Sequence, residues 1–148
     1  MPEATERTTC APGRIYAIAR VAVAFVWIYH GLVPKLLFAH PAESEILVLS
    51  GVSTSYAGSV VMIAGVAEIA MGLLMLIAWR ARFLFVVSIV LMLVALLSVA
   101  AFAPSYLIAA FNPVTLNVLV VALSVIGLLA SADQPVRRRN VPAIPKPS

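Results

Sequence analysis

Four long apolar runs, separated by short polar segments, dominate the pattern of the chain. They cover residues 15–38, 57–79, 83–102 and 113–130. A helix needs about 20 residues to cross the ~30 Å of hydrocarbon in a bilayer, so each run is long enough to span it. Lipid offers the backbone no hydrogen bonds, so the runs are expected to be helices, and the alternation typical of barrel strands is absent. The pattern therefore predicts an all-α membrane protein, a four-transmembrane-helix bundle.

The polar segments divide the chain into three parts. Residues 1–13 form a polar N-terminal tail, residues 14–131 the four-helix transmembrane domain, and residues 132–148 a proline-rich basic C-terminal tail. In the loop between the first two runs, Pro41 is followed by two glutamates and then by four apolar residues. Proline and acidic residues favour a helix start, and four apolar residues are too few to cross the bilayer. We therefore expect a short helix on the outer membrane interface in this loop.

Basic residues lie at three places that fall on one side of the membrane if the chain crosses it four times. They precede the first span, occupy the turn between the second and third, and follow the fourth: Arg7, Arg14, Arg80, Arg82, Arg137, Arg138, Arg139 and Lys146. The other two loops contain two glutamates or no charge. By the positive-inside rule, both termini are predicted to be cytoplasmic.

The composition supports lipid as the main solvent of this chain. Hydrophobic residues make up 63% of its 148 residues and charged residues 11%, whereas soluble domains have roughly 45–50% and about 25%. The net charge of +4 comes from residues beside the apolar runs, which favours the lipid bilayer over nucleic acid as a partner. The single cysteine, Cys10, can form no internal disulfide, and no metal motif surrounds it.

Polar side chains inside the spans are costly and need partners, so they are the first candidates for function. They are Arg20, His30 and Lys35 in the first span, Glu68 in the second and Asn117 in the fourth. At 1.5 Å per residue, Glu68 lies roughly 16 Å from the outer boundary, His30 roughly 12 Å and Asn117 roughly 6 Å. Arg20 lies near the inner end, where its side chain can reach the head groups, and the inner half contains no comparable polar group. The pattern predicts a polar pocket in the outer half of the bundle.

Proline and glycine positions shape this region. Pro34 cannot donate a hydrogen bond to the carbonyl four residues earlier, so the first helix should kink there. In the second span, Gly58, Gly65 and Gly72 recur every seven residues, a spacing that favours close helix contact. Glu68 shares a helix face with Gly65 and Gly72. Its carboxylate is therefore predicted to point into the bundle.

Each ionisable candidate has a functional and a structural interpretation. Glu68 could pair with Lys35 or His30 only to lock two helices together, or it could handle a proton. Lys35 alone could reach the outer head groups. His30 could bind a quinone head group, ligate haem or shuttle a proton, although a lone histidine is as often a hydrogen-bonded packing residue. Haem ligation is disfavoured because the second histidine, His40, falls outside the predicted span.

Three further side chains could contribute to the same pocket. Asn117 most often bridges helices at such a position, and Asn112-Pro113 is typical of a helix start with Asn112 as the N-cap. Trp27 and Tyr29 lie within the first span, where they could stack on a flat ligand or simply pack. The ligand-binding or proton-handling candidates are therefore His30, Lys35, Glu68, Asn117, Tyr29 and Trp27. No catalytic residue is identified, and no metal site is expected.

Three segments carry a distinctive combination of residues: VWIYHGLVPKLL at 26–37, AGVAEIAMG at 64–72 and NPVTLN at 112–117. Together they resemble the DoxX-like family of small bacterial membrane proteins. The resemblance implies a four-helix protein of the bacterial cytoplasmic (inner) membrane. It also points towards membrane redox chemistry, because the wider DoxX/DoxD group takes its name from subunits of a thiosulfate:quinone oxidoreductase.

The leading hypothesis is an accessory or quinone/small-molecule-binding component of a membrane redox system. His30 or Glu68 would hydrogen-bond the head group or pass a proton, and Lys35 would favour its reduced, anionic form. The sequence has no second cysteine and no nucleotide motif, so electrons would have to come from a redox partner protein. Two alternatives stay open: a structural or assembly subunit without its own activity, and a small transporter or channel, which would need to form a homo-oligomer.

Overall fold

The computed structural model describes residues 12–109 and 112–132, and every regular element within these ranges is helical. The elements are α1 (Pro12–His30), the π-helix η1 (Gly31–Leu37), α2 (Pro41–Leu49), α3 (Thr54–Ile77), α4 (Phe83–Phe102), the 3₁₀-helix η2 (Pro104–Ile108) and α5 (Pro113–Ala132). Cys10 and most of both predicted tails lie outside the described residues.

Four segments are long and apolar enough to cross a membrane. They are α1 continued by η1, α3, α4 and α5. Their limits differ by at most a few residues from the predicted runs, and α4 coincides with the predicted 83–102. The predicted all-α class and its four apolar spans are therefore confirmed. The short helix predicted in the first loop is also present, as α2.

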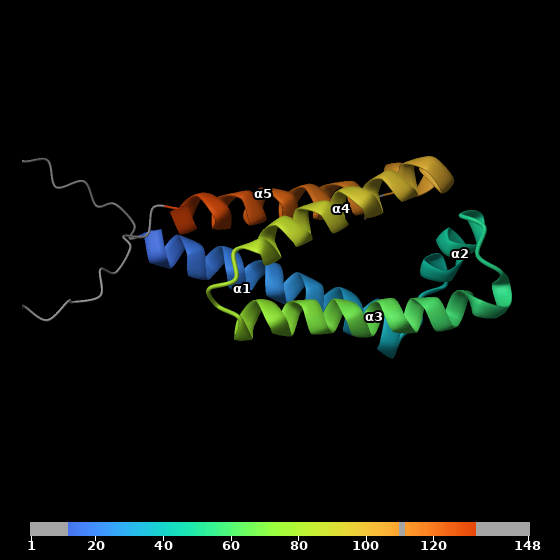
Figure 1. Ribbon diagram of the computed structural model, residues 1–148. Helices are drawn as coiled ribbons and strands as arrows, with labels where there is room; N and C mark the ends of the chain where they lie inside the picture. The colour runs from blue at the N-terminus through green and yellow to red at the C-terminus, as the bar shows by residue number, and fades with distance from the viewer. Residues whose placement is uncertain (1–11, 110–111, 133–148) are drawn as a thin grey trace, which may run out of the picture.

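The bundle consists of two helix pairs. α1 packs against α3 on one side and against α5 on the other, and α4 packs against α5. α3 and α4 are joined by a short turn but lie in different pairs, and they separate as they leave that turn (Figure 1). The pairs α1/α3 and α4/α5 are thus held together mainly through α1 and α5.

The two ends of the bundle differ in what they contain. The first residues of α1, the last residues of α5 and the α3–α4 turn share one end, here called the terminal end (Figure 1). α2 and η2 lie at the opposite end, here called the α2 end. α2 packs mainly against α3 and also contacts α4. It therefore lies across the end of the bundle that is opposite the α3–α4 turn, which connects the two helix pairs.

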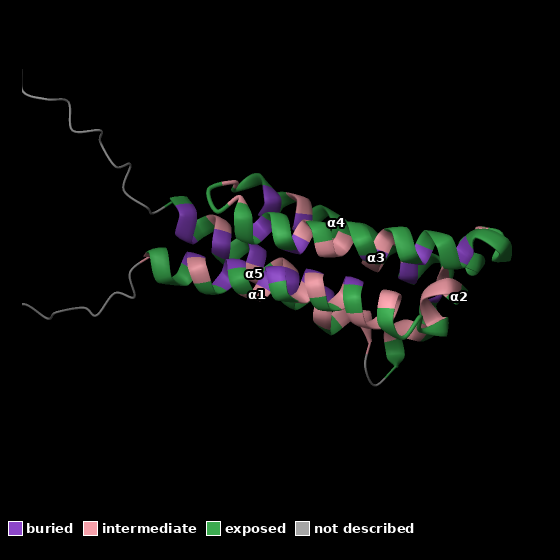
Figure 2. Ribbon diagram, turned by 90° about the horizontal axis from the view of Figure 1, so that it is seen from below, coloured by how far each residue is buried: buried purple, intermediate pink, exposed green. Residues whose placement is uncertain are grey.

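The apolar core lies mainly towards the terminal end. Its buried members are Tyr16, Val23, Ala24, Trp27, Met75, Leu84, Phe85, Val120 and Ala130. Figure 2 shows these buried stretches along the inward faces of the long helices, whereas α2 has no buried residue. The buried apolar cluster thus lies mainly towards the terminal end, and α2 contributes no buried residue to it.

Arg20 is the centre of a polar cluster at the terminal end, and its position differs from the prediction. Its side chain is fully buried (0% exposed), so it does not reach the head groups, and the terminal half does contain a polar cluster. Its Nε donates to the Met75 carbonyl at 2.5 Å, and its Nη atoms donate to the carbonyls of Ala78 and Ala81. The last carbonyls of a helix lack partners within it and form the negative end of its dipole. The guanidinium therefore finds better partners at the end of α3 than in the lipid.

Aromatic rings complete the surroundings of this guanidinium. The Cζ atom of Arg20 lies 5.5 Å from the ring centroids of Tyr16 and Phe85 and 5.8 Å from that of Trp79. The Tyr16 hydroxyl accepts a hydrogen bond from Arg20 and donates one to the Trp79 carbonyl. Cation–π attraction adds to the hydrogen bonds where charge is shielded from water. The cluster ties α1 to the α3–α4 turn.

Two of the three glycines predicted to pack do so. A Cβ at Gly72 would come within 2.6 Å of Ile28 Cγ1, and one at Gly65 within 2.9 Å of the Gly31 carbonyl oxygen. Nothing lies within 4 Å of such an atom at Gly58, which is exposed, so the prediction that Gly58 packs is wrong. Gly65 already lies against η1, and η1 ends at Leu37. Gly58, two turns nearer the start of α3 than Gly65, is therefore beyond the end of the first span.

Candidate functional site

Lys35 lies on η1, where the first span changes its helical register. Pro34 has no N–H to donate, so an α-helical hydrogen bond to the residue four positions earlier cannot form. The chain instead adopts a π-helix from Gly31 to Leu37, in which hydrogen bonds reach five residues back. The disruption predicted at Pro34 thus takes the form of a π-helix. Within it, the Cβ of Lys35 lies against Gly65 of α3.

Glu68 lies on the face of α3 that meets η1, as predicted. A Cβ at Gly31 would clash with the Gly65 carbonyl oxygen and would lie 3.0 Å from the Glu68 Cβ. Only glycine at position 31 therefore permits this close approach of η1 to α3. It leaves the side chains of Lys35 and Glu68 adjacent on the two helices.

These two side chains form an ion pair. The Lys35 Nζ donates a hydrogen bond to Glu68 Oε1 at 2.5 Å, and the side chains are only 9% and 19% exposed. The sequence left open whether Glu68 pairs with Lys35 or with His30, and the structure shows the lysine pair. Charge-assisted hydrogen bonds of this kind are short and strong because both partners are ionised.

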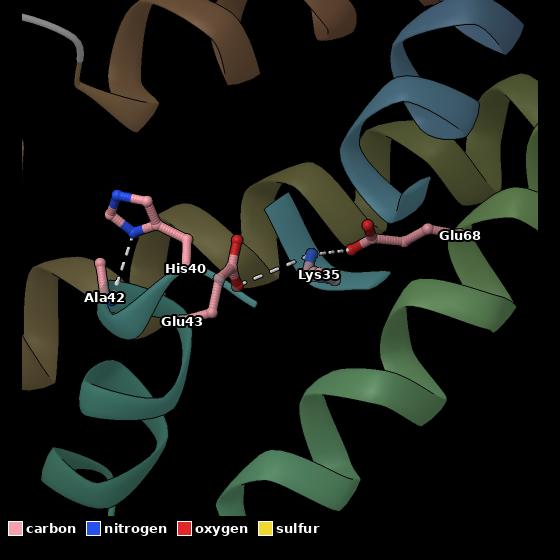
Figure 3. A network of polar contacts seen from close by, with 5 residues as sticks. All are labelled: Lys35, His40, Ala42, Glu43 and Glu68. Carbon is pink, nitrogen blue, oxygen red and sulfur yellow. Dashed lines mark hydrogen bonds and ion pairs between the residues drawn. The ribbon is translucent and has the colours of Figure 1, made fainter. Parts of the chain in front are cut away.

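A third charged group, which the sequence analysis did not include, completes the site. Glu43 Oε2 of α2 lies 3.7 Å from the Lys35 Nζ, and Figure 3 shows the ammonium group between the two carboxylates. The available signal was the acidic first turn after Pro41. It was assigned only to a helix start, because sequence alone does not fold the loop back over the bundle. We refer to Lys35, Glu43 and Glu68 as the ion triad.

One carboxylate oxygen of the ion triad forms no hydrogen bond with the described residues. Glu68 Oε2 is buried and has no hydrogen-bond partner among the described residues. Buried carboxylate oxygens without partners are costly, because desolvation is not repaid by a new bond. With one ammonium and two carboxylates ionised, the triad carries a net negative charge. It can therefore accept a further hydrogen bond more readily than it can hold an anion.

The other sequence candidates lie elsewhere in the bundle. Trp27 is buried, and its Nε1 donates to the Ser88 hydroxyl at 2.9 Å, towards α4. Tyr29 is 50% exposed and packs beside Phe25, with ring centroids 5.9 Å apart. Two residues correspond to about 200° around a helix. Trp27 and Tyr29 therefore cannot both face one pocket.

Asn117 is separate from the triad, and His30 lies near it but forms no hydrogen bond with it. Asn117 of α5 donates through Nδ2 to the Met92 carbonyl of α4 at 3.4 Å, a helix bridge of the kind expected at that position. It lies in the other helix pair from Glu68. His30 is the last residue of α1 and is partly buried, and its side chain does not cap η1. Of the six candidates, Lys35 and Glu68 are the two that the described structure joins by a hydrogen bond and an ion pair.

Hydrogen bonds test the predicted cap at Asn112 and show a second cap that was not predicted. The Thr115 backbone N–H donates to Asn112 Oδ1 at 3.1 Å, which confirms Asn112 as the N-cap of α5. His40 caps α2, since its Nδ1 accepts from the Ala42 N–H at 3.3 Å. Within residues 12–109 and 112–132, no group of three or more His, Cys, Asp or Glu side chains is arranged to hold a metal ion.

Comparison with protein families settles the relationship suggested by the three sequence segments. The model of the DoxX-like family matches residues 24–125, which include η1, α2, α3, α4 and the ion triad. The chain belongs to the DoxX-like family. No curated protein matches it, and no solved structure does. As a DoxX-like protein with four apolar spans, it is a multi-pass membrane protein.

Proposed function

We propose that this DoxX-like protein is a quinone- or small-molecule-binding component of a membrane redox system, with the ion triad as its binding site. The observation that carries the proposal is the Glu68 carboxylate. One of its oxygens pairs with Lys35, and the other is buried without a partner among the described residues. Ionisable groups within membrane spans are expensive, and most of them serve a substrate, a proton or a cofactor.

The charges of the triad favour a neutral head group. Lys35 already lies between two carboxylates, so an added anion would meet net repulsion. A head group with a hydroxyl can donate to Glu68 Oε2, and one with a carbonyl can accept from a remaining N–H of Lys35. A quinone or quinol fits this description better than the anionic form considered from the sequence. His30, one turn before Lys35, remains the candidate for passing a proton.

Electron transfer would require a partner. The chain has one cysteine, and the described residues contain no candidate metal cluster. A separate redox protein would therefore supply or accept electrons, and a homo-oligomer is compatible with the same role.

Binding of a soluble quinone provides the test. The purified protein in lipid nanodiscs is titrated with duroquinone and compared with a Lys35→Met/Glu68→Met variant, which removes both charges together. Replacing both partners by apolar groups is close to neutral for stability, so this variant should fold and yet bind at least tenfold more weakly. Tyr56→Phe, an exposed tyrosine at the start of α3, is the matched control. No binding by the wild type, or equal binding by the doubly substituted protein, contradicts the proposal.

A structural or assembly role is the second candidate, and one observation favours it. The ion pair lies on the tightest helix contact of the α2 end, where a Cβ at Gly31 or Gly65 would be within 3.0 Å of the other helix. An ion pair at this contact is well placed to hold α1 and α3 in register, and in this second role it binds no ligand. In that case Lys35→Met/Glu68→Met lowers the melting temperature but leaves growth unchanged, and the protein still co-purifies with its partner.

A further inference from the structure

α2 is the least embedded of the α-helices. It crosses the α2 end of the bundle, packs against α3 and contacts α4 (Figure 1). None of its residues is buried. Its contact with the bundle therefore depends less on apolar packing than that of the four long helices.

Two carboxylates of α2 tie it to both helix pairs. Glu43 lies 3.7 Å from the Lys35 Nζ on η1, in the α1/α3 pair (Figure 3). Glu45 Oε2 accepts a hydrogen bond at 2.7 Å from the hydroxyl of Tyr106 on η2, which follows α4. These two contacts are referred to as the tethers. They cross from α2 to opposite sides of the bundle, so α2 can leave only if both break.

The chain has a special backbone conformation on either side of α2. Ala39 has a φ of 42° and Gly51 a φ of 99°. Glycine adopts positive φ without penalty, whereas alanine is strained there. Such residues often occur at hinges and switch regions, where a change of φ and ψ relieves the strain. α2 is thus a rigid segment between two positions at which the backbone can reorient.

We propose that α2 is a lid over the Lys35–Glu68 ion pair, closed by the two tethers and opened by rotation at Ala39 and Gly51. Opening removes Glu43 from Lys35 and exposes the side of the pair that α2 covers. It thereby gives access to the Lys35 ammonium group, and through it to the ion pair, from the α2 end. The proposal rests on the proposed function only for what enters, a neutral quinone-like head group. The movement of α2 can be measured without any ligand.

Spin-label distances test the movement directly. Cys10 is replaced by serine, and labels are placed at Leu49→Cys on α2 and Ile108→Cys on η2, both exposed positions. Removing both tethers with Glu43→Gln and Tyr106→Phe should at least double the fraction of long distances, because the exposed Tyr106–Glu45 contact is weak and the Glu43–Lys35 contact is long at 3.7 Å. Tyr56→Phe should leave the distribution unchanged. An unchanged distribution in the tetherless protein overturns the lid.

A cross-link tests whether the lid controls access. Glu45→Cys and Tyr106→Cys are bridged by a short bifunctional thiosulfonate in the Cys10→Ser background, and the same protein with both cysteines singly capped is the control. The bridged protein should bind duroquinone at least tenfold more slowly than the capped one. Equal association rates contradict the lid. If neither form binds while the label distances still respond to the tethers, the proposed function fails and the lid stands.

Discussion

Glu68 and Lys35 form a buried ion pair that is energetically costly, and the same pair is the proposed binding site. Their side chains are 19% and 9% exposed, in segments that cross the membrane. Removing one member of a buried ion pair leaves an uncompensated charge, whereas replacing both with apolar groups of similar volume is often neutral. The pair therefore does not need to exist for stability, which is the reason to seek another role for it.

A stability measurement separates the cost of an unpaired buried charge from the contribution of the ion pair itself. Lys35→Met alone is expected to lower the free energy of unfolding by roughly 3 kcal/mol, because Glu68 then keeps a buried charge without its closest partner. Adding Glu68→Met should restore most of that loss. Reversible unfolding in detergent micelles measures both values. Equal losses in the single and double variants would show that the pair itself holds the fold together.

Tyr106 reports on the tether at the other side of α2. Its hydrogen bond to Glu45 raises the pKa of the phenol above the ordinary value, because the donated proton is held by a carboxylate. A raised pKa means that the tether is intact at pH values below ~10 and is lost as the pH rises through the higher value. Glu45→Gln should lower this pKa towards its ordinary value.

The measurement is the tyrosinate absorbance of the protein minus that of its Tyr106→Phe variant, recorded against pH. Identical titration midpoints for Tyr106 with and without the Glu45 carboxylate would mean that the tether does not form in solution.

At the scale of the elements, the contact between α3 and the first span depends on two glycines. Gly65→Ala should destabilise the protein by about 1–3 kcal/mol, because its Cβ would meet the Gly31 carbonyl oxygen at 2.9 Å and force the helices apart. Gly58→Ala is the matched control on the same helix, with nothing within 4 Å. It should be neutral or slightly stabilising, as alanine is the better helix former. Apparent melting temperatures in detergent compare the two, and equal shifts would place the α1–α3 contact elsewhere.

The elements could be predicted from the sequence because lipid forces apolar runs to form helices. The limits of α4 and the N-cap at Asn112 followed from local signals alone. The orientation of single side chains did not, since it depends on how helices rotate against one another. Helical periodicity alone puts Trp27 and Tyr29 on different sides of the first span. Only the structure shows that Trp27 is the one that faces the bundle, where it is buried, while Tyr29 is exposed.

The polar clusters illustrate the same limit. Glu68 was placed on the correct face because glycines mark a contact stripe within one helix. Glu43 was missed because its partner lies on another element, brought near by the fold of the loop. Arg20 was expected to reach the lipid head groups, but it satisfies the last carbonyls of α3. A pairing across elements has no periodic signature in the sequence.

For the whole molecule, we propose that the terminal end faces the cytoplasm. Arg80 and Arg82 lie in the α3–α4 turn at that end, and α2 with its glutamates lies at the other. In the Cys10→Ser background, Arg80→Cys should react with a membrane-impermeant maleimide only after the cells are opened. Ser50→Cys, at the end of α2, should react in intact cells. The reverse pattern would invert the topology and place the ion triad on the inner side.

The central claim is that a quinone-like head group binds at the Lys35–Glu68 pair of this DoxX-like protein. The most direct measurement is photolabelling with an azidoquinone in native membranes, followed by mass spectrometry of the labelled peptides. The account predicts labels on η1 and on α3 around Glu68, with labelling competed by duroquinone and lost in Lys35→Met/Glu68→Met. Labels confined to other helices, or labelling at the pair that survives loss of both charges, would contradict it.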